Sequence, residues 1–189
     1  MPTAKATMPA APLTDAAIVA AYIRNNRPRL AAELAWFAQP AAAAAAIKRA
    51  AAAQGQNGNR LSHQYRLSQG AIGAASKALV NARGELWAAT DFDELFDVVE
   101  DKVLRIPGIG PLYVYDTALR IGAFREILPE RVYLHAGARV GARRLLRVRN
   151  VGPVEIDDFP RPYRELPAYE IENLLCSYRR NFAARSALR

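Results

Sequence analysis

A glycine-rich turn followed by a single carboxylate is the part of this sequence best suited to chemistry. Residues 107–111 read Pro-Gly-Ile-Gly-Pro, which predicts a tight turn with one apolar residue, Ile109, between Gly108 and Gly110. Pro111 predicts a new helix, because the first helical residue needs no paired N–H. The N–H groups and the helix dipole at such a turn suit a phosphate and ignore base sequence. Asp116 lies six residues beyond Gly110, on the predicted helix.

The carboxylate of Asp116 has two interpretations. In the first, it lies in a reaction pocket, where a fixed anion stabilises positive charge that develops during a reaction and can orient an attacking water. Alternatively, Asp116 is only an ion-pair partner of Arg120, one turn further along the helix. We take Asp116 as the candidate catalytic residue.

Aromatic and basic side chains near Asp116 are candidates for binding a nucleic acid, because bases stack on aromatic faces and basic groups pair with phosphates. The expected substrate-binding residues are Tyr113, Tyr115, Tyr133, His135 and Arg139. The expected DNA-binding residues are Gly108, Ile109, Gly110, His63, Gln64, Arg66, Arg143 and Arg144. Core packing is the alternative for the tyrosines, and a structural role is the alternative for His135.

Two polar segments supply most of these basic residues. Residues 61–67, LSHQYRL, could reach into a groove or fill the gap left by a displaced base, or form an ordinary surface linker. Residues 131–154 contain no acidic residue and carry several arginines, including Arg147 and Arg149. Gly137 and Gly141 are four residues apart there, a spacing more typical of close helix packing than of ligand contact.

Apolar residues recur at helical spacing along most of the chain, which predicts an all-α, compact multi-helix fold. Residues 1–13 are expected to be a disordered lead and 14–189 a single domain, either with one core or with two lobes and a cleft. Its helical hairpin is expected at about 91–122, with Thr90 as N-cap and Gly122 as C-cap. We interpret the alanine run that begins at residue 41 as low-complexity drift.

Composition narrows the partners of the chain. The 189 residues carry a formal net charge of +8, which favours a polyanion, nucleic acid before an anionic membrane. The single cysteine, Cys176, excludes an internal disulfide and a four-cysteine metal site. Without a signal-peptide pattern or a membrane-span pattern, the sequence predicts a cytoplasmic monomer that binds double-stranded DNA and needs no cofactor.

The hairpin carries a resemblance to a known family. IPGIGPLYVYDTALRIGA, residues 106–123, resembles the helix-hairpin-helix of the endonuclease III superfamily of DNA glycosylases, whose pattern is roughly LPGVGxKTA. Val132, Tyr133, Leu134, His135, Arg139 and Val140 resemble, with small offsets, the family segment V-D-x-H-x-x-R-V. The resemblance covers roughly residues 90–148 and implies a DNA-repair-like fold, DNA binding and base flipping.

Two departures from the family pattern bear on the reaction. Leu112 stands where bifunctional members carry a Schiff-base lysine, which implies no amine-based lyase step. Tyr133 stands where the family has its catalytic aspartate. The resemblance implies that the position of Asp116 faces the pocket for the flipped base, where its carboxylate could supply the missing function.

A narrower resemblance involves the segments YDTALRIGA, VYLHAGARVGARRLL and YEIENLLCSY. Together they are similar to a group of small bacterial proteins that includes an anti-phage DNA glycosylase, which removes glucosylated hydroxymethylcytosine from phage DNA and leaves abasic sites. Nothing in composition or spacing indicates that substrate.

The sequence therefore predicts a monofunctional DNA glycosylase acting on a modified base. A non-catalytic, sequence-independent DNA-binding protein that uses the same hairpin is the main alternative. The third hypothesis is an interaction protein, in which the glycines only allow helices to pack closely.

Overall fold

The computed structural model describes residues 13–147 and 152–182, and this part of the chain is helical, without a β-strand. The α-helices are α1 (Asp15–Asn25), α2 (Arg27–Ala38), α3 (Ala43–Ala52), α4 (Gln69–Asn81), α5 (Arg83–Ala88), α6 (Phe92–Val103), α7 (Pro111–Arg125), α8 (Ala136–Leu146) and α9 (Ala168–Ser177). Three 3₁₀ turns are η1 (Ser62–Gln64), η2 (Ile156–Asp158) and η3 (Arg161–Glu165). The predicted all-α class is confirmed. The expected N-terminal lead, apart from Leu13, and Arg149 lie outside the described residues.

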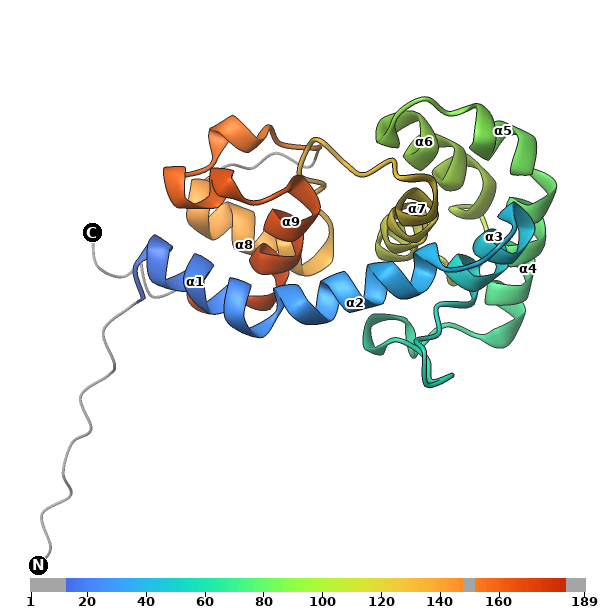
Figure 1. Cartoon of the computed structure of the whole chain (residues 1–189), viewed down its shortest axis with the longest axis horizontal. Coiled ribbons are helices and arrows are strands. Elements are labelled where there is room, and N and C mark those ends of the chain that lie inside the picture. Colours follow the sequence, from blue (N-terminus) through green and yellow to red (C-terminus); the bar gives the residue numbers. More distant parts are fainter. Residues whose placement is uncertain (1–12, 148–151, 183–189) are drawn as a thin grey trace, which may run out of the picture.

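The buried apolar side chains form two separate cores. The first core gathers residues of α3 to α7, and the second gathers residues of α1, α8, α9 and the segment 154–166. Figure 1 shows the two groups of helices on opposite sides of the molecule, with α2 running from one to the other. Of the two arrangements left open by the sequence, the structure has the two-lobed one.

Helix α7 is the centre of the first lobe. It is buried on almost every side, with nine of its residues in the interior, and it packs against α2, α3 and α6. A helix that faces protein all round is not amphipathic, and polar residues on it are therefore exceptional. Asp116 and Arg120 are two such residues, and both lie on the side of α7 that borders α2.

The turn between α6 and α7 has the geometry expected from the sequence. Gly108 adopts φ +89°, a left-handed conformation that favours glycine, and Ile109 is buried at 8% exposure. Pro111 is the first residue of α7. A side chain added at Gly108 or Gly110 would meet no atom within 4 Å, so the turn faces open space.

Two expected helix caps are wrong. The N-cap of α6 is Asp91, whose carboxylate accepts from the Glu94 N–H, while the Thr90 N–H and hydroxyl both donate to the Glu94 side chain. Helix α7 continues past Gly122 to Arg125 and is capped by Glu126 in a left-handed conformation. Gly122 is required for packing instead, because a Cβ there would lie 2.3 Å from the carbonyl oxygen of Ile127.

Small residues bring helices together in both lobes. In the alanine run that begins at residue 41, Ala41, Ala42 and Ala45 are exposed and Ala46 is buried, whereas Ala50 and Ala51 further along α3 belong to the first core. In the second lobe, a Cβ at Gly141 would lie 2.3 Å from the Leu175 carbonyl oxygen, so α8 and α9 are in backbone contact. Close packing of α8 against α9 therefore accounts for the four-residue spacing of Gly137 and Gly141. None of the described helices is long and apolar enough to cross a membrane.

Candidate active site

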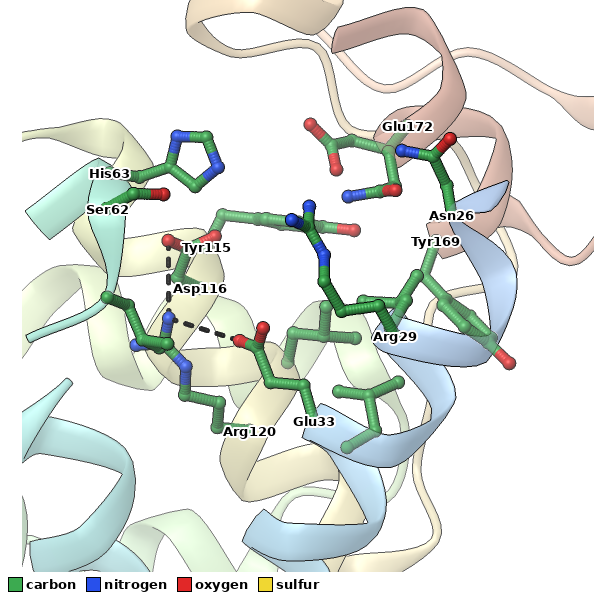
Figure 2. A pocket seen from close by; sticks show the side chains of 15 residues that line it. Asn26, Arg29, Glu33, Ser62, His63, Tyr115, Asp116, Arg120, Tyr169 and Glu172 are labelled. Carbon is green, nitrogen blue, oxygen red and sulfur yellow. Dashed lines mark hydrogen bonds and ion pairs between the residues drawn. The ribbon is translucent and has the colours of Figure 1, made fainter. Parts of the chain in front are cut away.

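A cavity of about 190 Å³ lies where the two lobes meet. Four elements line it with polar side chains: α2, η1, α7 and α9. The residues are Asn26 just before α2, Arg29 and Glu33 of α2, Ser62 and His63 of η1, Tyr115, Asp116 and Arg120 of α7, and Tyr169, Glu172 and Asn173 of α9. In Figure 2 the side chain of Arg29 extends from α2 toward the middle of this cavity.

The Asp116 carboxylate is held in place by two donors. Gln64 Nε2 donates to Asp116 Oδ2 at 2.6 Å, and Arg120 Nη2 lies 3.5 Å from the same oxygen. The Arg120 guanidinium is 4% exposed, lies 3.8 Å from Glu33 and packs over the Phe37 ring. Asp116 therefore pairs with Arg120, as the structural interpretation required, and still has 18% of its side chain exposed toward the cavity.

A second acidic side chain reaches the same place from the other lobe. Glu172 of α9 borders the 190 Å³ cavity together with Asp116. Its carboxyl receives no hydrogen bond from the described residues, and its nearest basic neighbour is His135, with 3.7 Å between Oε1 and Nδ1. Burial, together with the negative charge of Asp116, raises the pKa of Glu172 well above its usual range.

His135 lies immediately before α8 and is 6% exposed. Neither ring nitrogen has a hydrogen-bond partner among the described residues, and the ring stands edge-on to Tyr115 with 4.2 Å between centroids. Burial lowers the pKa of His135, so its neutral form is favoured. The Tyr115 hydroxyl is also buried and unpaired. Several polar groups without partners therefore converge on one region, where a bound molecule could satisfy them.

Two larger cavities flank the N-terminal turn of α7. One of about 400 Å³ is lined by Leu112, Asp116, His135 and Glu172, and shares His63 with the first cavity. The other, of about 410 Å³, lies beside Pro111 and is lined by Tyr133, His135 and Arg139 among others. Asp116 and Glu172 thus border two adjoining spaces.

Not every expected substrate-binding residue reaches these spaces. Tyr113 is 2% exposed, and its hydroxyl donates to the Ala51 carbonyl at 2.8 Å, so it belongs to the first core. Tyr133 borders the 410 Å³ cavity and hydrogen bonds to Asp93, with its ring against Phe96. Arg139 folds back onto the Leu134 carbonyl and still lines that cavity.

Some of the expected DNA-binding residues are exposed, whereas others are buried or bonded to other parts of the protein. Gly108, Arg66 and Arg143 are exposed, and Gly110 is partly exposed. Ile109 serves as the buried plug of the turn, and Arg144 bonds to the Arg179 carbonyl. Gln64 is a correction: it is 2% exposed and positions Asp116, because η1 turns its side chain inward.

The neighbours of Gln64 point outward. His63 is exposed and borders the first cavity, and Tyr65 is 64% exposed beside Arg66, whose Nε donates to its hydroxyl. The segment 61–67 therefore combines one buried side chain, which contacts Asp116, with neighbours that face solvent.

Glu172 and Arg29 are the residues that sequence reasoning missed. A signal for Glu172 was present: Ala168, Glu172 and Leu175 follow the i, i+4, i+7 spacing of a buried helix face, so an acidic residue occupies an apolar position. Arg29 carried no comparable signal, because an exposed arginine on a helix is ordinary.

The fold and site together define a two-lobed helical protein with titratable side chains from both lobes in one cleft. Within the described ranges, no three His, Cys, Asp or Glu residues are grouped so as to hold a metal ion. Comparison of the chain with protein-family models, with curated proteins and with solved structures finds no match.

Proposed function

We propose that the protein is a monofunctional DNA glycosylase that flips a modified base into the interlobe cleft and hydrolyses its N-glycosidic bond. One observation carries the proposal: a carboxylate, Asp116, is anchored by Gln64 and Arg120 and opens on a cavity between the lobes. At about 190 Å³ this cavity is below the roughly 300 Å³ at which drug-sized sites begin, and suits a single ring system.

Asp116 stabilises the positive charge that develops on the deoxyribose as the bond to the base lengthens. Because Gln64 and Arg120 fix the carboxylate before substrate arrives, no reorganisation is needed during the reaction. A water molecule, oriented by the same carboxylate, then adds to C1′ and leaves an abasic site.

The lining of the cleft supports hydrolysis without a lyase step. Leu112, which stands at the position of the lysine in bifunctional relatives of the resembled family, borders the 400 Å³ cavity beside Asp116. No lysine lines this cavity or the other two described above. An amine nucleophile is therefore absent from these walls.

The turn between α6 and α7 is the proposed phosphate-binding site. The backbone N–H groups of Gly110 and Leu112 have no acceptor among the described residues, and Gly110 faces open space. Leu112 and Pro111 border the two larger cavities, so a phosphate held at this turn lies beside the cleft.

The resemblance noted in the sequence suggests glucosylated hydroxymethylcytosine as one substrate. A pyrimidine ring in the 190 Å³ cavity would leave the adjoining 400 Å³ cavity for the sugar. With this substrate, the proposed activity removes modified bases from phage DNA and is an anti-phage defence.

The test is base release by purified protein from duplex oligonucleotides that each carry one modified base, including glucosylated hydroxymethylcytosine. Alkali added afterwards cleaves abasic sites, and strand scission is read on a gel. Asp116→Asn should lower the single-turnover rate by a factor on the order of 10³ while duplex binding persists. Asp157→Asn, at a side chain that is 94% exposed, is the matched control and should act as wild type.

The same experiment decides against the alternative, a non-catalytic DNA-binding protein. That protein would bind every duplex with similar, salt-dependent affinity and release no base. Equal rates for Asp116→Asn and wild type would exclude Asp116 as the catalytic residue.

A further inference from the structure

Glu172 and Asp116 are two carboxyl side chains that face one cavity from opposite lobes. Asp116 is on α7, in the first lobe, and Glu172 is on α9, in the second. Both also border the adjoining 400 Å³ cavity. In Figure 2 the Glu172 side chain extends from α9 on the side of the cavity opposite η1.

Their surroundings differ in kind. Asp116 has two donors, Gln64 and Arg120, that stabilise the anion. Glu172 has no hydrogen-bond donor among the described residues, its side chain is 10% exposed, and the negative charge nearby is that of Asp116. Two carboxyl groups whose environments favour opposite protonation states are the usual arrangement for an acid and an anionic stabiliser at one site.

The groups that face Glu172 come from each neighbouring element. They are Tyr22 (α1), Arg29 (α2), His63 (η1), Tyr115 and Asp116 (α7), His135, and Cys176 on α9 itself, with Arg179 beyond the end of α9. His135 Nδ1 lies 3.7 Å from Glu172 Oε1, and burial lowers the pKa of His135. Burial thus disfavours the charged form of both groups, the carboxylate of Glu172 and the imidazolium of His135.

We propose that Glu172 is the proton donor to the departing base, an inference that rests on the proposed glycosylase function. The bond between C1′ and the base nitrogen breaks, and its electron pair goes to the base. The Glu172 carboxyl proton moves to a ring nitrogen or carbonyl oxygen of that base. Water adds to C1′ and gives its proton to Asp116. Proton exchange with solvent then returns Glu172 to its protonated form and Asp116 to its anionic form.

This role also defines the class of substrate. A base that leaves as an anion needs protonation, whereas a base already made cationic by ring alkylation does not. The site is therefore built for a neutral modified base whose departure depends on an acid.

The experiment is a pH–rate profile of single-turnover base release for wild type, Glu172→Gln and Glu165→Gln, on whichever duplex of the oligonucleotide set is cleaved. Glu165 is exposed and lines none of the three cavities described above, so it is the matched control. Wild type and Glu165→Gln should lose rate about tenfold per pH unit on the alkaline side, because the acid form disappears. Glu172→Gln should be slower by at least about 100-fold near pH 7 and should lack that alkaline limb, with duplex Kd within a few-fold of wild type.

The outcomes separate this inference from the proposed function. Base release by wild type with an unchanged rate for Glu172→Gln overturns the inference alone. A slow Glu172→Gln variant that keeps the wild-type pH profile, or that binds duplex much more weakly, assigns Glu172 to binding or structure and also overturns it. No base release by wild type from any duplex overturns both. If Glu172→Gln does not fold, the pH–rate profile of wild type still tests the proposal. A profile whose rate does not fall on the alkaline side would reject Glu172 as the proton donor.

Discussion

The Gln64 amide donates to the Asp116 carboxylate at 2.6 Å, a contact between side chains 52 residues apart in the sequence. It joins the short turn η1 to the central helix of the first lobe. Gln64 is almost fully buried, whereas its neighbours His63 and Tyr65 are exposed. The segment that carries the outward-facing residues is thus tied to the carboxylate that faces the cavity.

Replacing Gln64 by leucine should impair the site through Asp116. The substitution keeps a similar volume but leaves the carboxylate with only the longer contact to Arg120, and removing one partner of a buried hydrogen bond costs about 1–3 kcal/mol. We expect a lower Tm and a single-turnover rate reduced by about 10- to 100-fold, since 1.4 kcal/mol corresponds to a factor of ten. Gln69→Leu, at an exposed position on α4, is the control and should change neither measurement. An unaltered rate for Gln64→Leu would show that the contact does not position Asp116.

Replacing Gly110 by valine should weaken DNA binding without unfolding the protein. Gly110 has φ −129° and ψ 173°, an extended conformation that any residue adopts, and no atom lies within 4 Å of an added Cβ. The new side chain would stand beside the free N–H groups and keep a phosphate away. Loss of the phosphate contact should weaken the Kd at low salt. The slope of log K against log salt should stay nearly unchanged, because a backbone N–H carries no charge and the slope depends on the phosphates that Lys and Arg neutralise.

The control for this prediction is Gly73→Val on α4, where an added Cβ also meets open space. Binding by Gly110→Val that matches both wild type and Gly73→Val would mean that the turn does not contact DNA.

Glu172 should make the protein less stable as the pH rises above about 4.3, the ordinary glutamate pKa, and Glu172→Gln should remove that contribution. Burial raises the pKa of this group in the folded state. Above the ordinary glutamate pKa of about 4.3, the unfolded chain releases the proton while the folded chain keeps it, so stability is lost as pH rises, by up to about 1.4 kcal/mol per unit. The loss ends once the pH passes the raised, folded-state pKa.

Urea unfolding at a series of pH values measures this effect on the protein alone. Glu172→Gln should equal wild type at pH 4 and exceed it increasingly toward neutral pH, whereas Glu165→Gln should follow wild type throughout. Parallel curves for wild type and Glu172→Gln would mean that Glu172 is ionised in the folded protein.

The helices and the α6–α7 turn could be predicted because their determinants are local. Apolar spacing marks most of the helices, and Pro107, Gly108 and Pro111 define the turn within a few residues. The short helix α5 was not predicted, because Arg83 and Gly84 there indicated a flexible joint. The caps at Thr90 and Gly122 were mistaken because each residue type fits two roles, and only tertiary packing decides between them. At Gly122 that packing is the close approach of the Ile127 carbonyl.

The meeting of Asp116 with Glu172 could not be predicted, because it depends on how two lobes are placed. The two residues are on different helices in different cores, and no local pattern specifies the distance between those cores. An acidic residue at an apolar helical position indicated that Glu172 is buried, but not what it faces. Gln64 was misassigned for a similar reason: a polar residue in a basic loop gives no sign that it turns inward.

The second core combines both ends of the described chain, with α1 packed among α8, α9 and the segment 154–166. During synthesis, α1 emerges well before the rest of its own lobe, whose other buried residues begin at Val132, so its apolar face lacks that lobe until the first lobe has been made. The first lobe, by contrast, is assembled from contiguous sequence and can form earlier. The cleft therefore joins a lobe built from neighbouring segments, which carries Asp116, to a lobe built from distant segments, which carries Glu172.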